Sequence, residues 1–242
     1  MLLTSIARLR QAKDSAAFKL AVVDISKASG FGACFIISPV ARNTWQGRVL
    51  DNFGFDERWA KAYRKGLYRI DPLPEIALAH GLPFRLGEAG KLLKLNKSEQ
   101  RYLAILDRGG ASDAIAFPTF GSGARTAIIC FGHHPNPQQL TDMIVLELHV
   151  QLQAAYHEFC RILSHETALE NELSIREKDV LYWLTQGKSN SAIAQILEIS
   201  AGTVDTYLRR VFQKMNVTER VGAAMAAVRY GYVIPGEFPR PG

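Results

Sequence analysis

The pattern of apolar and polar positions divides the chain into two regions of different character. Residues 1–165 mix helical periodicity with short apolar runs, whereas residues 173–233 show helical periodicity throughout. In the first region, helices are predicted by three- and four-residue apolar spacing or by helix-start residues. The segments with this character are 4–30, 56–66, 72–80 and 96–106. The short apolar runs that predict strands are 33–38, 47–52, 112–119 and 125–132.

A long helical pattern over residues 138–163 follows the last predicted strand. Its apolar stripe is wide enough to pack on a domain and also on a partner subunit. The order of helices and strands predicts an α+β domain with an antiparallel sheet over residues 1–165. Residues 166–172 carry three glutamates and are typical of a linker. Residues 173–242 then form a second, all-helical domain.

The second domain has the pattern of a helix-turn-helix. Ser174, followed three residues later by Glu177, is the signature of a capping box at a helix start. Ser189 and Ser200 stand at the starts of two further helices, which a tight turn connects. A fourth helix is expected over about 219–230. Two short helices at this spacing indicate DNA binding, and a small helical bundle with a solvated basic face is the structural alternative.

Composition narrows the class of protein. The 242 residues are 48% hydrophobic and 21% charged, which excludes a disordered chain. No apolar run is long enough to span a membrane, and three widely spaced cysteines suit a reduced cytoplasm better than a disulfide framework or a metal site. The formal net charge of +6 permits a polyanionic partner without identifying one.

Several stretches of the second domain resemble the DNA-binding domain of LuxR/NarL-type regulators. They are Leu173-Ser-Ile-Arg-Glu-Lys-Asp-Val-Leu, Gly187-Lys188-Ser189, Ile193-Ala194, Ile199-Ser200, Thr203-Val204, Lys214-Met215-Asn216-Val217 and Arg220. The chain departs from the family at Ala192 and Tyr207, where Glu and His are common. The resemblance implies that Asp205 and Arg209 face the bases of double-stranded DNA. It implies phosphate contacts for Lys188, Thr203, Thr206, Arg210 and Lys214.

The first domain contains a set of side chains that suits a small amphiphilic ligand. Trp59 and Tyr63 are four residues apart, so they share one helix face. Each combines a large apolar body with one hydrogen-bonding group, and Asp71 offers an acceptor for an amide N–H. The structural alternatives are that both aromatics are core residues and that Asp71, which precedes Pro72, caps a helix.

The spacing Trp-x3-Tyr-x4-Tyr, followed by Asp71-Pro72 and Leu82-Pro83-Phe84, resembles the autoinducer-binding domain of LuxR-type quorum-sensing regulators. That resemblance implies an α-β-α sandwich that binds an N-acyl-homoserine lactone. Trp59 would donate to the lactone carbonyl, Asp71 would accept from the ligand amide, and Tyr63 would lie beside the acyl carbonyl. Departures from the family pattern occur at Phe55, Leu86, Ala114 and Ile129, and they make the expected pocket more apolar. Phe55, Leu86 and Ile129 are themselves expected to contact the ligand.

We therefore expect a ligand-responsive transcription regulator that acts as a homodimer on a palindromic site, needs no cofactor, and can contact RNA polymerase. One alternative is a regulator that binds DNA without a lactone or responds to another signal. An enzyme is a poor alternative, because no cysteine or histidine falls in a nucleophile motif.

Overall fold

The structure is a computed structural model that describes residues 16–39, 48–166 and 172–233. It contains two compact units, one holding most of residues 1–163 and the other holding residues 164–242. Of the first predicted helix, residues 4–15 lie outside the described residues, as does most of the expected linker.

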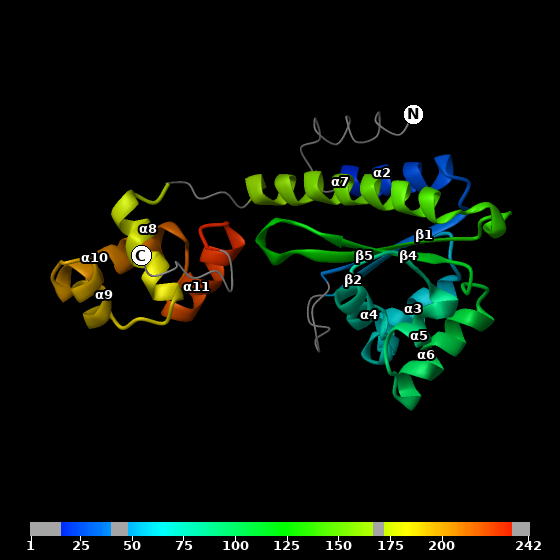
Figure 1. The fold of residues 1–242 in the computed structure, drawn as a ribbon, viewed down its shortest axis with the longest axis horizontal. Helices are drawn as coiled ribbons and strands as arrows, with labels where there is room; N and C mark the ends of the chain where they lie inside the picture. The colour runs from blue at the N-terminus through cyan, green and yellow to red at the C-terminus, as the bar shows by residue number, and fades with distance from the viewer. Residues whose placement is uncertain (1–15, 40–47, 167–171, 234–242) are drawn as a thin grey trace. The chain divides into compact units, whose positions relative to one another are not determined.

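A five-stranded antiparallel sheet forms the centre of the first unit (Figure 1). Its strands lie in the order β2-β1-β5-β4-β3. The bounds are β1 Ala33–Ser38, β2 Val49–Phe53, β3 Phe84–Arg85, β4 Ile115–Phe120 and β5 Thr126–Gly132. The central strand β5 and its neighbour β1 are buried along nearly their whole length because helices cover both faces of the sheet. The predicted antiparallel α+β architecture is confirmed.

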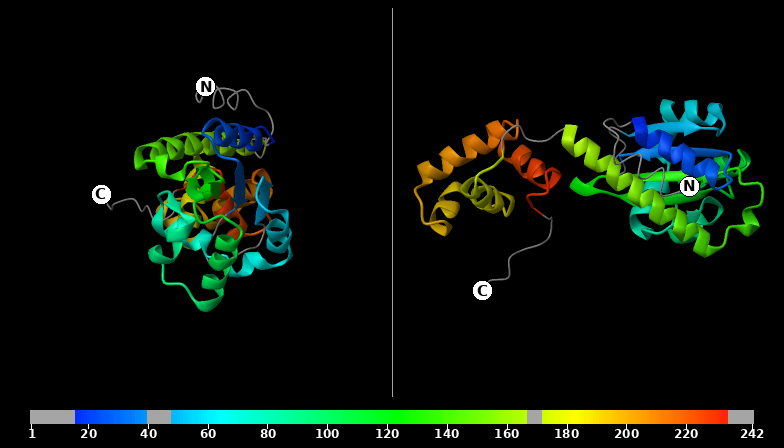
Figure 2. Two further views of the ribbon diagram at one scale, coloured as in Figure 1. Left: turned by 90° about the vertical axis from the view of Figure 1, so that its right-hand side faces the viewer. Right: turned by 90° about the horizontal axis from the view of Figure 1, so that it is seen from above.

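Helices α2 (Ala16–Ala28) and α7 (Asp142–Glu166) lie side by side over one face of the sheet (Figures 1 and 2). From α2, Phe18, Val22 and Ile25 point into this layer, and Leu148 and Leu152 of α7 meet them there. The ring of Phe18 stacks on Phe159 with 4.5 Å between the ring centroids. The apolar spacing that predicted these two helices therefore corresponds to their sheet-facing sides.

The opposite face of the sheet is covered by a group of shorter helices (Figure 1). They are α3 (Glu57–Lys65), α4 (Leu73–His80), α5 (Ala89–Leu92) and α6 (Lys97–Arg108). Asn96 and Glu99 form a capping box at the start of α6, where the sequence predicted a helix. Strand β3 and helix α5 were not predicted, because elements of two and four residues are too short to show a periodicity.

The second unit consists of α8 (Ile175–Thr185), α9 (Asn190–Ile196), α10 (Ala201–Lys214) and α11 (Arg220–Arg229). Ser174, Ser189 and Ser200 each accept a hydrogen bond from a backbone N–H in the first turn of the helix that follows. These are the caps that the sequence predicted. The four helices share a core that includes Val180, Ile193, Val204 and Val211.

Within the described residues, the structure contains no helix with both the length and the apolarity that a membrane span requires.

Candidate ligand-binding site and DNA-contacting helix

Asp71 is the centre of a buried polar cluster on the face of the sheet that α3–α6 cover. Its carboxylate accepts a hydrogen bond from the Tyr63 hydroxyl at 2.8 Å and another from the Leu73 backbone N–H at 3.0 Å. Burial raises the pKa of Asp71 to about 6, although these hydrogen bonds and the nearby Arg48 charge oppose that rise. Asp71 therefore both supports the start of α4 and holds Tyr63 in place.

Arg48 is the cation of this cluster. Its guanidinium lies 3.9 Å from the Asp71 carboxylate, and both side chains are nearly inaccessible to solvent. The same group donates to the Tyr68 carbonyl oxygen at 3.5 Å. A buried carboxylate with a cation at this distance keeps part of its charge in an apolar environment. Arg48 thus places a buried positive charge beside the Asp71 carboxylate. None of the residues that the sequence predicted for the ligand site is a cation.

Two further polar atoms reach this region. The indole nitrogen of Trp59 and the hydroxyl oxygen of Tyr102 are buried and have no hydrogen-bond partner among the described residues. The Trp59 and Tyr63 rings lie 5.7 Å apart, and the Tyr63 and Tyr102 rings lie 6.5 Å apart. Longer polar contacts nevertheless join these atoms to the cluster, since Trp59 opposes the rise in the pKa of Tyr102 and Tyr102 opposes the rise in the pKa of Asp71.

Phe55 packs as a core aromatic between the sheet and α3. Its ring contacts Phe35 edge-on at a centroid distance of 5.2 Å and closely approaches Gly132, where a Cβ atom would lie 2.5 Å from the Phe55 ring. Phe55 and Trp59 also line a cavity of about 310 Å³, whose opposite wall includes Leu106 of α6. Two of the six residues expected to bind the ligand, Phe55 and Trp59, thus line the same cavity.

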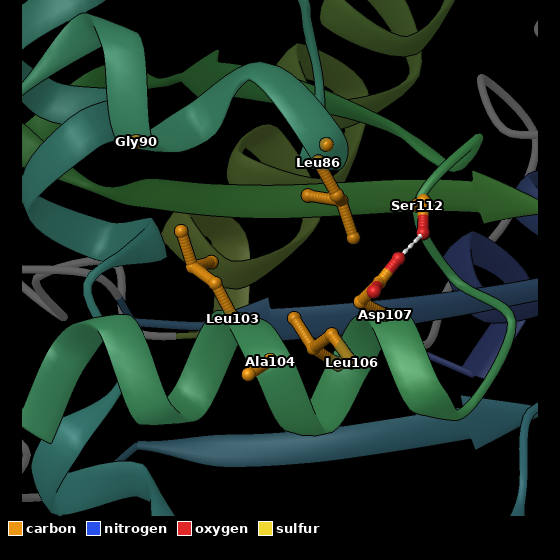
Figure 3. Close-up of a pocket in the computed structure, with 8 residues that line it drawn as sticks. Leu86, Gly90, Leu103, Ala104, Leu106, Asp107 and Ser112 are labelled. Atoms are coloured by element: carbon orange, nitrogen blue, oxygen red, sulfur yellow. Dashed lines mark hydrogen bonds between the residues drawn. The ribbon is translucent and has the colours of Figure 1, made fainter.

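Leu86 lines a second cavity, of about 350 Å³, between α5 and α6 (Figure 3). Its side chain points toward Leu106, and Leu103 closes the other side. The polar end carries Asp107 and Ser112, which share a hydrogen bond. Leu106 lines both cavities, so α6 separates the space beside Trp59 from the space beside Leu86.

The expectation for Ile129 is wrong. Its side chain packs with Phe117 and Phe131 in the layer beneath α2 and α7, on the face of the sheet away from Trp59 and Asp71. Successive side chains on a strand point to opposite faces, so the neighbour Cys130 faces the pocket layer instead.

Helix α10 presents a polar face beside its buried one. Asp205, Thr206, Arg209 and Arg210 are exposed, while Val204, Leu208 and Val211 are buried. An exposed face that carries arginines on a helix-turn-helix suits contact with base edges and phosphates. Lys188, at the turn between α8 and α9, is exposed as well.

Two other expected DNA contacts, Thr203 and Thr206, are engaged within α10. The Thr203 hydroxyl pairs with that of Ser200 at 2.8 Å. The Thr206 hydroxyl donates to the Gly202 carbonyl at 2.9 Å. Each of these hydroxyl oxygens can still accept a further hydrogen bond. Thr206 is also exposed to solvent.

Asp205 is held by a chain of hydrogen bonds that crosses three helices. The Asn190 side-chain amide donates to the Asp205 carboxylate at 2.6 Å, and Arg220 donates to the Asn190 side-chain oxygen at 3.0 Å. Arg220 also donates to the Lys188 carbonyl. The carboxylate therefore has a fixed orientation on the exposed face of α10.

Lys214, for which a phosphate contact was expected, forms an ion pair within the second unit. Its ammonium lies 2.7 Å from the Glu177 carboxylate and also donates to the Glu172 carbonyl at 2.9 Å. Glu177 is buried and also accepts from the Ser174 backbone N–H. Burial alone would raise the pKa of Glu177, but its hydrogen bonds with Lys214 and Ser174 together with the Lys214 charge hold that pKa below its usual value. Lys214 thus neutralises a buried carboxylate in the first turn of α8.

Sequence reasoning missed three residues of these sites, Arg48, Tyr102 and Asn190, and it also missed the pairing of Glu177 with Lys214. A single tyrosine on an amphipathic helix such as α6 is normally a core residue, so its position alone carries no functional signal. Among the described residues, no group of three or more His, Cys, Asp or Glu side chains could hold a metal ion.

Two family models match this chain. The model of the autoinducer binding domain matches residues 14–161, and the model of bacterial regulatory proteins of the luxR family matches residues 171–227. The curated relatives include the transcriptional activator protein LuxR of Aliivibrio fischeri, which is 24% identical over 76% of this chain and 74% of its own length. The transcriptional activator protein BjaR1 of Bradyrhizobium diazoefficiens is 26% identical over 73% of each chain.

Among solved structures, that of SdiA from Escherichia coli is similar over 96% of this chain and 98% of its own, with a TM-score of 0.67 and 17% identity. This likeness concerns the fold. The matching families consist of transcription regulators that bind small-molecule autoinducers and are not enzymes. The chain belongs to the LuxR family of autoinducer-binding, DNA-binding bacterial regulators.

Proposed function

We propose that this protein senses an N-acyl-homoserine lactone or a related small amphiphile and, as a dimer, binds a palindromic promoter site. The observation that carries the proposal is the buried cluster of Trp59, Tyr63 and Asp71. It offers an N–H donor and a carboxylate acceptor next to an apolar cavity. An acyl amide ligand supplies both a carbonyl acceptor and an N–H donor, together with an apolar tail.

In the proposed complex, Asp71 accepts from the ligand amide N–H and Trp59 donates to the lactone carbonyl. Tyr63 lies beside the acyl carbonyl, where its bond to Asp71 fixes both groups before the ligand arrives. The acyl tail lies against apolar side chains such as Phe55 and Leu106. This arrangement is typical of a small-molecule pocket, which is mostly apolar with a few well-placed polar groups.

DNA binding is assigned to the exposed face of α10. Arg209 is placed to pair with guanine O6 and N7, while Arg210 and Lys188 contact phosphates. Two copies of α10 in a dimer would meet half-sites about one helical turn of DNA apart. Regulation of transcription further implies a contact with RNA polymerase.

A second candidate signal is an amphiphile without a lactone. Phe55 and Leu86 put apolar side chains where the family pattern has polar or indole groups, so fewer hydrogen bonds are available to a lactone ring. A solved structure of SdiA in complex with octanoyl-rac-glycerol, similar to this chain with a TM-score of 0.60, shows that fold with a ligand of this kind.

The proposed ligand is tested by measuring the thermal stability of the full chain with and without each member of a panel of acyl-homoserine lactones. A ligand at 100 times its Kd should stabilise the folded state by about 2.7 kcal/mol. Asp71→Asn should keep most of the fold and lose most of this stabilisation. If no lactone stabilises the wild-type chain while DNA binding is intact, the lactone is refuted and acylglycerols become the next panel.

The DNA part is tested by comparing Arg209→Ala with Arg210→Ala on matched and mismatched sites. Arg209→Ala should cost about 1–3 kcal/mol at the specific site and relax the preference for one base pair. Arg210→Ala should weaken binding to all sequences alike and reduce the salt dependence. Equal effects of the two variants on sequence preference would refute the assigned roles.

A further inference from the structure

Three side chains from three helices form a hydrogen-bonded relay that ends on the exposed face of α10. Asn190, the first residue of α9, donates from its amide nitrogen Nδ2 to Asp205 Oδ1 at 2.6 Å. Arg220, the first residue of α11, donates to the Asn190 side-chain oxygen at 3.0 Å and also to the Lys188 carbonyl. Asp205 is exposed, whereas Asn190 and Arg220 are half-buried. The Arg220–Asn190–Asp205 relay thus fixes an exposed carboxylate through groups that are themselves tied to the fold.

Arg220 determines which way the Asn190 amide points. An asparagine amide has one end that donates and one that accepts, whereas a guanidinium only donates. Arg220 therefore holds the oxygen of Asn190, and the NH2 group is left to face Asp205. The opposite orientation would place the amide oxygen against a carboxylate, which only accepts. Because the Asn190 amide is neutral, its bond orients the Asp205 carboxylate without neutralising it.

A fixed negative charge on the helix proposed to contact DNA is unfavourable unless it meets a specific partner, because phosphates repel it. Asp205 precedes Arg209 by four residues, so the two share the exposed face of α10. In the major groove, the donors that a carboxylate can accept from are the cytosine N4 amine and the adenine N6 amine. The adenine amine lies beside the acceptor N7, which repels a carboxylate, so cytosine is the better match.

We propose that Asn190 and Arg220 are positioning residues that direct the Asp205 carboxylate at the N4 amine of a cytosine, and that this relay sets the preference for one C·G base pair. The inference rests on the proposed function, which places this face of α10 in the major groove. Arg209 selects a base that offers acceptors, whereas Asp205 selects one that offers a donor. A carboxylate held by the relay cannot turn away from guanine O6 or thymine O4, so wrong sequences are rejected by repulsion.

The test starts from the site that the wild-type full chain selects from a randomised double-stranded oligonucleotide library. Kd values for this site and for each of its single base-pair substitutions are measured for the wild type, Asn190→Ala, Asp205→Asn and the double variant. Asn190→Ala should reduce the preference for cytosine at one position roughly 3-fold, as expected for one lost hydrogen bond. Gln195→Ala removes another exposed amide from α9 and should keep the wild-type preference at every position.

Asp205→Asn gives the sharpest expectation, because Asn190 still holds the oxygen of the introduced amide and its NH2 group then faces the base. The preference at that position should change from cytosine to thymine or guanine, by roughly 5- to 10-fold in the ratio of Kd values. In the double variant the introduced amide is free to turn, so neither preference should remain. Additive losses would show instead that Asn190 acts on DNA independently of Asp205, and would overturn the positioning role.

Arg220→Met should weaken the cytosine preference at the same base pair as Asn190→Ala. Arg220 also ties the α8–α9 turn through the Lys188 carbonyl, so the Kd for a scrambled duplex is measured for each variant. A purely structural role would change all Kd values alike and leave the preference intact, which would overturn the inference and leave the proposed function standing. The same holds if Asp205→Asn tightens binding to every sequence equally. If the wild-type chain selects no sequence, site-specific DNA binding fails, and this inference fails with it.

Discussion

Asp71 illustrates how one carboxylate serves structure and binding together. A carboxylate at the start of a helix is an ordinary cap, and Asp71 accepts the Leu73 N–H accordingly. Its second oxygen accepts from Tyr63 in a buried site beside Arg48. The two interpretations that the sequence left open, cap and pocket residue, are therefore compatible, because each uses a different oxygen.

The pKa of Asp71 predicts a pH-dependent stability. Burial raises this pKa from 3.8 to about 6 in the folded chain. Between these values the folded state binds more protons than the unfolded state, so the free energy of unfolding falls as pH rises. The loss is complete above pH 6 and amounts to about 3 kcal/mol. Asp71→Asn lacks this component, so urea denaturation should show its stability gaining on the wild type between pH 4 and pH 7.

Asp113→Asn, at an exposed position, is the control and should follow the wild type across this range. Parallel pH profiles for the wild type and Asp71→Asn would show that the carboxylate titrates at its ordinary pKa despite its burial.

The residues that sequence placed correctly and those it misplaced differ in a physical way. Trp59, Tyr63 and Asp71 lie close together in the fold because α3 and the turn before α4 are local in sequence. Ile129 was misplaced because β5 is buried on both faces, so its apolar run carries no alternation that distinguishes one face from the other. No local sequence pattern indicated the place of Tyr102 in this cluster, because its neighbours in the fold are more than 30 residues away along the chain.

At the scale of elements, the starts of helices were the feature that the sequence predicted best. The capping residues Ser174, Ser189 and Ser200 all accept the backbone bonds that the sequence predicted. Caps are local, so a window of four residues contains the whole interaction. The partner of Glu177 is Lys214, 37 residues later, and no local pattern could reveal it.

The Glu177–Lys214 pair predicts that Lys214 contributes to stability more than to DNA affinity. The carboxylate side chain is 3% exposed, and removing its partner leaves a buried charge unpaired. Lys214→Met should therefore destabilise the second unit by about 3–5 kcal/mol. Hydrogen exchange of the α8 and α10 amides should report this as lost protection.

Lys188→Met is the matched control at an exposed lysine. It should leave exchange protection unchanged and weaken DNA binding in a salt-dependent way. The role given to Lys214 fails if Lys214→Met keeps full protection and loses DNA affinity as Lys188→Met does.

For the whole molecule, the distribution of charge is a poor guide to function. Residues 1–165 carry 20 basic and 14 acidic side chains, while residues 166–242 carry nine of each. The whole excess of +6 thus belongs to the autoinducer-binding region. The region that binds DNA is neutral in sum because its nine acidic side chains balance its nine basic ones. Some of these charges also pair with one another, as Glu177 and Lys214 do. Its DNA-binding role follows from the exposed face of α10 and not from net charge.

Helix α7 is apolar on two faces, and this predicts a dimer contact. Leu148 and Leu152 are buried against the sheet, whereas Met143, Leu146 and Val150 are 66%, 45% and 69% exposed. Those three exposed positions follow the three- and four-residue spacing of one helix stripe. Exposed apolar groups that form a contiguous stripe mark an interaction surface more often than isolated ones do.

Val150→Lys places a charge on this stripe, and a two-fold symmetric dimer meets the substitution twice. The dimer Kd measured by sedimentation should rise about 10- to 100-fold, and affinity for a palindromic site should fall with it. Leu82→Lys, at an exposed apolar position outside α7, should dimerise as the wild type does. If Val150→Lys also dimerises normally, the contact lies elsewhere. The next surface to test would then be α11, where Val221 and Met225 are also exposed, because four-residue spacing puts them on one helix face.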